Sequence, residues 1–216
     1  MPLDTKIGYS CQDARHLSTQ KQWDVIVCDV PCSGDGTIRK DPHILPLWKP
    51  SQGQLLHTTQ LQILLRAFQL AKVGGIICYS TCSLNPVENE AVVAAALHQR
   101  AGGEQQQPAF ELLEVPTLMK GFHLRPGLST WRVAEYCNDD SEYSTSKGDD
   151  EDDDETPQLT WYDAFEDAHK VMSNPVRSMW PPAKNVSLLH LERCLRLWPQ
   201  DNDSGGFFLT LIRRNR

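Results

Sequence analysis

Apolar residues in the first half of the chain form two short runs separated by a longer segment with helical spacing. The runs WDVIVCDV (23–30) and GGIICYS (74–80) are rich in Val and Ile and are bounded by turn-forming residues, a pattern typical of buried strands. Between them, apolar residues recur at helical spacing: Leu55, Leu56, Ile63, Leu64, Ala67, Phe68 and Ala71. The pattern predicts a strand, a long helix and a second strand, with each strand buried on both faces.

The order strand, helix, strand also predicts how the two strands pair. Val73-Gly74-Gly75 is expected to end the helix, because glycine is common just past a helix end. The strands joined by such a crossover run parallel, and sequential strands are often neighbours, about 4.8 Å apart. The loops that follow the two strands should therefore open at the same edge of the sheet.

A further helix and a C-terminal hairpin are predicted after the second strand. A helix is expected to begin near Asn85, which suits an N-cap, with Pro86 at the first helical position and Glu88 completing a capping box. Later, the runs RCLRLWP (193–199) and GFFLTLIRR (206–214) flank a polar turn. This arrangement predicts an antiparallel hairpin that closes the sheet.

Composition narrows the class of protein. A chain of 216 residues can form one sizeable domain with a buried core. No apolar run approaches the roughly 20 residues needed to cross a bilayer, and the start MPLDTKIGYS lacks the apolar core of a signal peptide. Seven cysteines without a secretory signal fit reduced thiols in the cytosol or nucleus better than a disulfide framework. We expect no membrane association.

The net charge of −7 is concentrated in one segment. Residues 139–155 hold ten acidic residues and one lysine, whereas the rest of the chain holds 20 basic and 18 acidic residues. Apart from Tyr143 this segment has no apolar side chain with which to form a core. We therefore expect a disordered acidic insertion at 138–157. A role in binding a partner, or in keeping non-specific RNA away, is the alternative for this segment.

The candidate chemistry lies where the two predicted strands end. Cys32 and Cys82 each follow a strand, and Asp29 ends the first one. In open α/β sheets this edge is where ligands bind, so these side chains are expected to converge there. If the amino end of the helix that follows Cys82 points toward the thiol, it would lower the pKa of this thiol below the usual value of about 8.5. Cys28 and Cys78, inside the strands, are expected to be small core residues.

A metal site and a redox pair are the alternatives to catalysis. The gaps between Cys28 and Cys32 and between Cys78 and Cys82 are compatible with zinc ligands, but the first cysteine of each pair would have to leave the strand interior. Neither pair has the two-residue spacing of thioredoxin-like motifs. We therefore expect no metal, and a catalytic pair.

Three stretches resemble the Sun-domain family of RNA cytosine-5 methyltransferases, and most closely its eukaryotic tRNA-directed members. They are CDVPCSGDGTIRK (28–40), YSTCSLNPVENEAVVA (79–94) and LHLERCLRLWPQDNDSGGFFLTLIRR (189–214). The resemblance implies a Rossmann-like α/β methyltransferase sheet, and methyl transfer from S-adenosylmethionine to carbon 5 of cytidine in RNA, with tRNA as the expected substrate. It also implies a nuclear or nucleolar protein that could also occur in the cytoplasm.

The resemblance also implies a role for each site residue. It makes Cys82 the nucleophile that adds to carbon 6 of cytosine, and Cys32 the thiol that assists release of the methylated product. Covalent addition of this kind splits one difficult step into easier ones. Asp29 is expected to hydrogen-bond the cytosine edge and to border the methyl donor. A structural role is the alternative for Asp29, whose carboxylate could fix the Pro31 turn. The alternative for Asp13 is likewise structural, since an aspartate after a strand could start a turn.

Asp13, in QDAR, matches the family's aspartate that contacts the adenine of S-adenosylmethionine. The family's glycine-rich donor loop would lie well upstream of this residue, and only twelve residues precede it here. We therefore expect residues 1–216 to be the C-terminal portion of a catalytic domain, with a sheet that lacks its first strands and with weak or no activity alone. A catalytically inactive module that binds RNA or a partner is the alternative function.

The sequence gives only weak indications of which residues contact RNA. Arg39 and Lys40 follow the Pro-Cys loop and are candidates for phosphate contacts near the target base, which must leave its stack to reach a buried thiol. Trp131, Trp161 and Trp180 could stack on bases, but core packing is the expected role of these large side chains.

Overall fold

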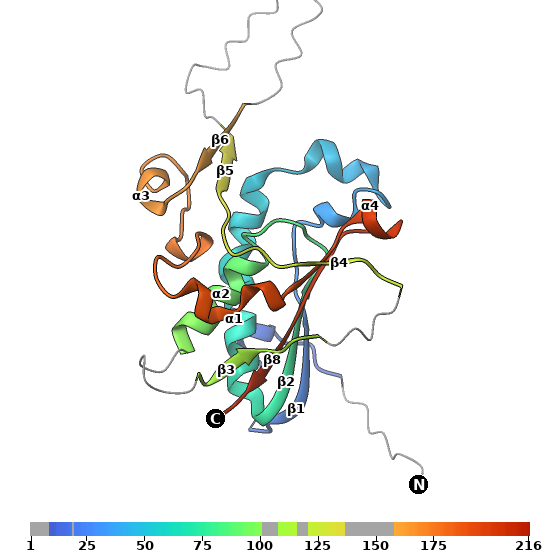
Figure 1. The fold of residues 1–216 in the computed structure, drawn as a ribbon, viewed down its shortest axis with the longest axis vertical. Coiled ribbons are helices and arrows are strands. Elements are labelled where there is room, and N and C mark those ends of the chain that lie inside the picture. The colour runs from blue at the N-terminus through green and yellow to red at the C-terminus, as the bar shows by residue number, and fades with distance from the viewer. Residues whose placement is uncertain (1–8, 19, 101–107, 116–120, 137–157) are drawn as a thin grey trace, which may run out of the picture.

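A computed structural model describes residues 9–18, 20–100, 108–115, 121–136 and 158–216 of the chain (Figure 1). The predicted acidic insertion at 138–157 lies outside these ranges. Among the helices that are described, none combines the length and the apolar character needed to span a membrane.

The predicted strand–helix–strand unit is present. Strand β1 (Trp23–Asp29), helix α1 (Pro50–Leu70) and strand β2 (Ala71–Thr81) follow one another, and β1 pairs with β2 in parallel. The pairing sets Val27 opposite Cys78 and Asp29 opposite Ser80. The prediction of two neighbouring parallel strands is therefore confirmed, and the loops after β1 and β2 leave the sheet at the same edge.

The prediction that Val73-Gly74-Gly75 ends the helix is wrong. Helix α1 ends at Leu70, and Ala71 already has an extended backbone, although its amide still donates to the carbonyl of Ala67. The two glycines lie inside β2, where the pairing with β1 shifts register between Trp23 and Val25. Gly74 has a φ of 80°, which only glycine adopts readily, so the pair serves an irregularity of the strand.

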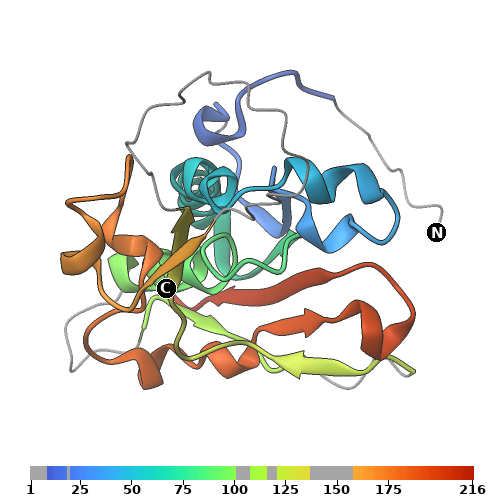
Figure 2. The same ribbon diagram turned by 90° about the horizontal axis from the view of Figure 1, so that it is seen from above.

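The C-terminal strands complete the sheet. Strand β8 (Phe207–Arg214) runs antiparallel to β2 on one side and to β7 (Leu195–Leu197) on the other, which confirms the predicted hairpin. The sheet order is β1-β2-β8-β7-β4, with β4 (Leu124–Pro126) at the end and β3 (Phe110–Leu112) also pairing with β8. Figure 2 shows β8, β7 and β4 side by side. Among the strand pairs of the described residues, only β1 and β2 are parallel within this mixed sheet.

The remaining elements cover the sheet or extend from it. Strands β5 (Val133–Tyr136) and β6 (Leu159–Tyr162) form a separate two-stranded antiparallel sheet. The other described helices are α2 (Glu90–Arg100), α3 (Phe165–Ala168) and α4 (Pro199–Asn202), with 3-10 helices η1 (Ala14–His16), η2 (Asp35–Thr37), η3 (Pro42–Leu47), η4 (Arg177–Met179), η5 (Val186–Leu189) and η6 (Leu191–Arg193).

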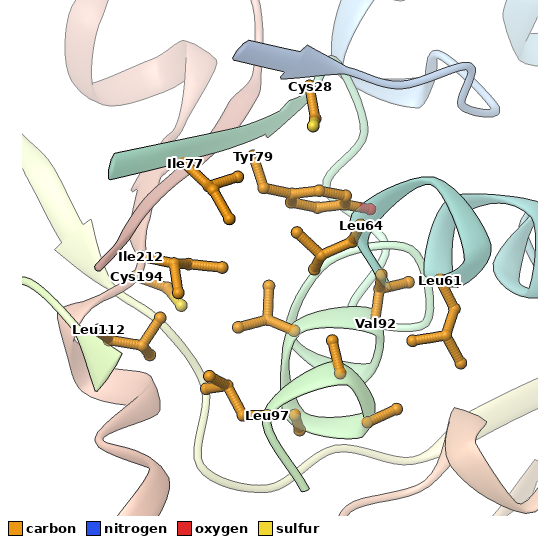
Figure 3. Packing of buried hydrophobic residues seen from close by; sticks show 14 of the residues in the cluster. Cys28, Leu61, Leu64, Ile77, Tyr79, Val92, Leu97, Leu112, Cys194 and Ile212 are labelled. Carbon is orange, nitrogen blue, oxygen red and sulfur yellow. The ribbon is translucent and has the colours of Figure 1, made fainter. Parts of the chain in front are cut away.

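The main core lies between one face of the sheet and helices α1 and α2. Figure 3 shows Ile77 and Ile212 of the sheet facing Leu64 of α1 and Val92 of α2. All four side chains are fully buried. Burying a residue of this size typically stabilises a fold by about 1.5–3 kcal/mol, so this layer fixes the positions of β1 and β2. Cys28 also lies in this core, as expected.

The opposite face of β1 is open, so the prediction that this strand is buried on both faces is wrong. Val25 and Val27 are 63% and 68% exposed. Their partners on β2, Ile76 and Cys78, are half-buried. The reason is that α1 and α2 both pack on the other face of the sheet, and no described helix packs over these residues.

A buried ion pair joins the C-terminal strands to α2. The guanidinium of Arg196 in β7 makes two hydrogen bonds to the carboxylate of Glu90, one of them 2.6 Å long. Their side chains are 2% and 0% exposed. Arg196 also donates to the carbonyl of Leu84, 2.8 Å away, so the pair supports the loop that follows β2.

Candidate active site

The loops that follow β1 and β2 meet at the edge of the sheet. Cys32 comes three residues after the end of β1, and Cys82 directly follows β2. Their sulfur atoms are 3.2 Å apart, and both residues are half-buried and reduced. The structure therefore brings the two cysteines together, because parallel pairing of β1 and β2 delivers both loops to one place.

Backbone and side-chain hydrogen bonds hold the two loops together. The amide of Gly36 donates to the carbonyl of Cys82 at 3.0 Å, and the carboxylate of Asp35 accepts from the amide of Leu84 at 2.8 Å. A Cβ atom at Gly36 would lie 2.7 Å from the Cys82 carbonyl oxygen and 2.6 Å from that of Gly206. Glycine is thus required at position 36 by the close approach of two backbone segments.

The short contact between the sulfurs separates the acidities of the two thiols. A hydrogen bond from Cys32 lowers the pKa of Cys82 to about 7, against the opposing effect of burial and of the Asp29 and Asp35 charges. The same hydrogen bond, together with burial, raises the pKa of Cys32. Of the two thiols, Cys82 is therefore the one that ionises near neutral pH, with Cys32 as the protonated donor.

The cause of the low pKa of Cys82 differs from the one predicted. The sequence predicts that the amino end of the following helix lowers it, but α2 begins only at Glu90. The residues before it, 86–89, form a turn in which the amide of Ala91 donates to the carbonyl of Pro86. The main cause is instead a neighbour 50 residues away in sequence, Cys32.

Asp29 lies at the same corner. It is exposed, and its carboxylate accepts a hydrogen bond of 2.9 Å from the hydroxyl of Ser80 in the neighbouring strand. Its negative charge raises the pKa of Cys82, which places it within electrostatic range of that sulfur. Within the described residues, this carboxylate therefore binds a side chain of β2 and not the Pro31 turn.

Asp13 lies at the start of η1, which contacts helix α1. Its carboxylate caps η1 by accepting from the amide of Arg15 at 2.9 Å, and it also pairs with the Arg15 guanidinium at 2.6 Å. These hydrogen bonds hold the pKa of Asp13 well below its usual range. Asp13 is exposed, and the cap shows that it does start a turn.

Arg39 and Lys40 follow the Pro-Cys loop and face the turn before β8. Arg39 forms an ion pair with Asp203 of that turn, with both side chains exposed. The Lys40 ammonium lies 3.7 Å from the position a Cβ would take at Gly205. Both cations therefore border the rim of the site, and that of Arg39 is partly neutralised by Asp203.

Glu88 is a residue whose role the sequence did not reveal. The capping box predicted for it is absent, since the amide of Asn85 donates to the hydroxyl of Ser83 and not to Glu88. Asn85 itself does cap the turn, because its side chain accepts from the amide of Val87 at 3.0 Å. The Glu88 carboxylate turns instead toward Ser33 and Ser83, the residues that follow the two cysteines.

The other predicted roles have mixed outcomes. Trp131 and Trp180 are buried, and their indole N–H groups donate to the carbonyls of Met179 and Tyr162, as core residues do. Trp161 is 50% exposed, and the Arg132 guanidinium lies over its ring. Within the described residues there is no group of three or more His, Cys, Asp or Glu side chains able to hold a metal ion.

Comparisons with known proteins identify the family. A family model described as 16S rRNA methyltransferase RsmB/F matches residues 2–125, a range that includes both cysteine loops. The chain belongs to this family of RNA cytosine-C5 methyltransferases. The resemblance seen in the sequence is thereby confirmed, and so is the Rossmann-like methyltransferase fold.

Curated relatives include tRNA-directed members of the family. The chain is 37% identical over 211 residues to the multisite-specific tRNA:(cytosine-C(5))-methyltransferase trm4b of Schizosaccharomyces pombe, covering 96% of this chain and 27% of that protein. It is 36% identical over 197 residues to a tRNA (cytosine(34)-C(5))-methyltransferase of Drosophila melanogaster, covering 90% and 23%. The chain therefore spans about a quarter of the length of these relatives.

Solved structures share the fold. NSun6 from Pyrococcus horikoshii, solved with SFG, superposes with a TM-score of 0.56 at 15% identity, covering 96% of this chain and 34% of that one. A methyltransferase homologue from the same organism gives a TM-score of 0.50 at 21% identity, covering 90% and 40%. At these identities the likeness concerns the architecture of the family alone.

Proposed function

We propose that this chain carries the catalytic cysteines of an RNA cytosine-C5 methyltransferase that acts on tRNA. The proposal rests mainly on one observation, the 3.2 Å separation of the Cys32 and Cys82 sulfurs at the carboxyl edge of β1 and β2. Family membership and the tRNA-modifying relatives support the choice of reaction and substrate. Residues 138–157 are proposed to be an acidic insertion with no part in the chemistry.

Cys82 acts as the nucleophile in this proposal. Carbon 5 of cytosine is too weak a nucleophile to take a methyl group directly. The Cys82 thiolate adds its electron pair to carbon 6, which shifts the ring π-electrons so that carbon 5 becomes nucleophilic. A pKa of about 7 means that about half of the Cys82 thiols are ionised at neutral pH, without a separate base.

Cys32 assists the release of the product. After methylation, water accepts the proton on carbon 5, and the C–H electron pair reforms the double bond between carbons 5 and 6. As this double bond forms, the C6–S bond breaks and its electron pair returns to the Cys82 sulfur. The raised pKa of Cys32 keeps its thiol protonated, so that it can donate a hydrogen bond to this leaving sulfur.

Asp29 stabilises the reacting base. It lies exposed beside the cysteine loops, and a carboxylate there can accept a hydrogen bond from the amino or protonated ring edge of cytosine as the thiolate adds. The hydroxyl of Ser80 fixes its orientation. Asp29 is therefore a polar anchor for the base in this proposal.

S-adenosylmethionine, when bound, would supply a methyl group on a positively charged sulfonium. The residues present fit such a donor in charge, because Asp29, the last residue of β1, and Asp13 both carry exposed carboxylates that complement the sulfonium charge. Asp29 would border the methyl end. Asp13 would accept from the adenine or ribose, in exchange for part of its present pairing with Arg15.

RNA is proposed to approach over the rim formed by the Pro-Cys loop. Arg39 and Lys40 are exposed there and would meet phosphates next to the target base, which has to leave its stack to reach the half-buried sulfurs. A nuclear or nucleolar location, with some protein in the cytoplasm, is proposed from the same resemblance to tRNA-directed members of the family.

Adduct trapping tests the proposed function. Because residues 1–216 are expected to have weak activity alone, the purified chain is used in excess over a tRNA transcript with S-adenosylmethionine. A low yield of 5-methylcytidine is expected, detected by mass spectrometry of nucleosides. Cys82→Ala should abolish both methylation and any adduct, whereas Cys32→Ala should give a covalent protein–RNA band on a denaturing gel. The double variant is the control for non-specific attachment.

The outcomes separate the alternatives. A trapped band with Cys82→Ala, and none with Cys32→Ala, would reverse the two roles. RNA binding by the native chain without any methylation or adduct would favour an inactive binding module of the same fold. In that case both variants should bind tRNA as the native chain does.

A further inference from the structure

Glu88 is a fully buried carboxylate at the junction of the two cysteine loops. One oxygen accepts from the Ser33 amide at 2.8 Å and from the Gln60 side-chain amide at 3.0 Å. The other accepts from the hydroxyls of Ser33 and Ser83, at 2.5 and 2.8 Å. Every one of these donors is neutral, so a negative charge is held here by a set of four converging hydrogen bonds.

The partners of Glu88 are related to the cysteines by position. Ser33 directly follows Cys32, and Ser83 directly follows Cys82. A single carboxylate therefore accepts a hydrogen bond from the serine that follows the cysteine in each of the two loops, which lie 50 residues apart in sequence. Gln60 of α1, which also donates to the carbonyl of Pro31 at 2.9 Å, anchors this arrangement to the core helix.

We propose that Glu88 is a positioning residue that holds the Cys32 and Cys82 loops at a fixed separation, and that release of the methylated product depends on it. The inference rests on the proposed function. Addition to carbon 6 needs the Cys82 thiolate, whose formation the Cys32 hydrogen bond assists, whereas release also needs Cys32 to stay within hydrogen-bond reach of the leaving sulfur. Loss of the link between the loops should therefore slow release more than it slows methyl transfer.

The charge of Glu88, like its hydrogen bonds, is expected to favour product release. The pKa of Cys32 is raised chiefly by its hydrogen bond with Cys82 and by burial, and the Glu88 carboxylate adds to that rise. Glu88 thus helps to keep Cys32 in the protonated form that donates to the leaving sulfur. A neutral amide at position 88 would weaken both effects.

The first test is a comparison of Glu88→Gln with Glu111→Gln. Glutamine keeps the shape of Glu88, but its NH2 group cannot accept from the two serine hydroxyls. Glu111 lies in β3, where it pairs with Arg213, and serves as a matched control for the loss of one charge. With tRNA and S-adenosylmethionine, 5-methylcytidine formation and the lifetime of the covalent adduct are followed in the same single-turnover reaction.

The expected result is a change in the ratio of two steps. Because a displacement of about 1 Å at a reacting group can cost about a hundredfold in rate, we expect the adduct to persist at least about tenfold longer in Glu88→Gln. Methyl transfer should slow less, and Glu111→Gln should match the native chain. A purely structural role would lower the folded fraction and scale both steps equally. That pattern, or equality with Glu111→Gln, would overturn the inference.

A second measurement does not depend on activity. Dibromobimane becomes fluorescent when it bridges two nearby thiols, and peptide mapping identifies a Cys32–Cys82 product. Bridging should fall several-fold in Glu88→Gln and stay unchanged in Glu111→Gln. If the native chain bridges normally but forms neither adduct nor methylated tRNA, the proposed function fails while the bridging result still decides whether Glu88 sets the separation.

Single serine variants keep the inference testable if Glu88→Gln does not fold. Ser33→Ala and Ser83→Ala each remove one arm of the arrangement and leave the carboxylate in place. Each should reproduce the longer adduct lifetime and the lower bridging to a smaller extent. Native behaviour of both folded variants in both assays would overturn the inference as well.

Discussion

Replacing Cys32 with alanine should change the reactivity of Cys82 in a way that depends on pH. In the native chain the Cys32 thiol is the main cause of the low Cys82 pKa of about 7. Without this donor, burial and the charges of Asp29 and Asp35 raise the pKa, and the backbone hydrogen bond at Cys82 is the remaining cause that lowers it. We therefore expect the pKa of Cys82 in Cys32→Ala to rise to about 9, close to the usual thiol value.

The size of the effect follows from two opposing changes. Near pH 7 the ionised fraction of Cys82 would fall from about one half to about 1%, a loss of about fiftyfold. A thiolate of higher pKa is intrinsically more nucleophilic, by about six- to tenfold for a rise of about two pKa units. Alkylation of Cys82 should therefore be about five- to eightfold slower in the variant near pH 7. Near pH 10, where both proteins are ionised, the variant should react faster by about sixfold or more.

Iodoacetamide alkylation provides the assay. The rate of modification is measured from about pH 5 to pH 10, and the Cys82 peptide is quantified by mass spectrometry so that exposed Cys11 does not interfere. Crossing of the native and variant rate profiles is the expected signature. A profile for Cys32→Ala with its midpoint still near 7 would refute the idea that Cys32 is the source of the acidity, and would point to the backbone around Cys82.

Three further predictions concern the fold around the site. Gly36→Ala should lower the free energy of unfolding by about 1–3 kcal/mol and slow methylation, because the added methyl group would collide with the Cys82 carbonyl. Urea unfolding measures the stability and a turnover assay measures the methylation rate. A variant as stable as the native chain would contradict this close packing. The pKa of His57 is lowered by burial, so the unfolded chain binds a proton that the folded chain does not. The free energy of unfolding should therefore decrease as the pH falls below about 6.5, by up to about 1.4 kcal/mol per pH unit. Thermal unfolding at several pH values measures this slope, which should be smaller in His57→Gln. Arg196→Ala leaves the buried Glu90 carboxylate without its cation, with only the Leu128 amide still donating to it among the described contacts, and should cost about 3–5 kcal/mol. Exchanging both Arg196 and Glu90 for apolar residues should recover most of this loss in urea unfolding.

The sequence was informative where one local pattern decides the structure. Apolar runs and helical spacing predicted β1, α1 and β2 and their parallel pairing, and the polar turn before 206–214 predicted the C-terminal hairpin. The helix end was misplaced, because a glycine pair serves a helix stop and an irregular strand equally well. The burial of β1 was also misjudged, since a run of Val and Ile does not reveal which face receives helices.

The site was predictable only in part for a similar reason. Residues adjacent to a strand end, such as Cys32, Cys82 and Asp29, could be placed at one edge from topology alone. The contact of Glu88 with Ser33 and the source of the Cys82 acidity could not, because both arise from contacts across 50 or more residues of sequence. Local reasoning assigned each to the nearest helix start, where capping and dipole rules apply.

The open face of β1 and β2 has a consequence for any measurement made on this chain. Val25 and Val27 are exposed and lie beside the half-buried Ile76 and Cys78, so two neighbouring strands share an apolar surface in contact with solvent. When two molecules associate through these surfaces, the buried apolar area stabilises the complex by about 25 cal/mol per Å². Self-association is therefore favoured as the protein concentration rises. Rates per mole would then drift downward in concentrated samples for reasons unrelated to sulfur chemistry. Light scattering alongside each assay, with Val27→Lys as a dispersed reference, keeps the two effects apart.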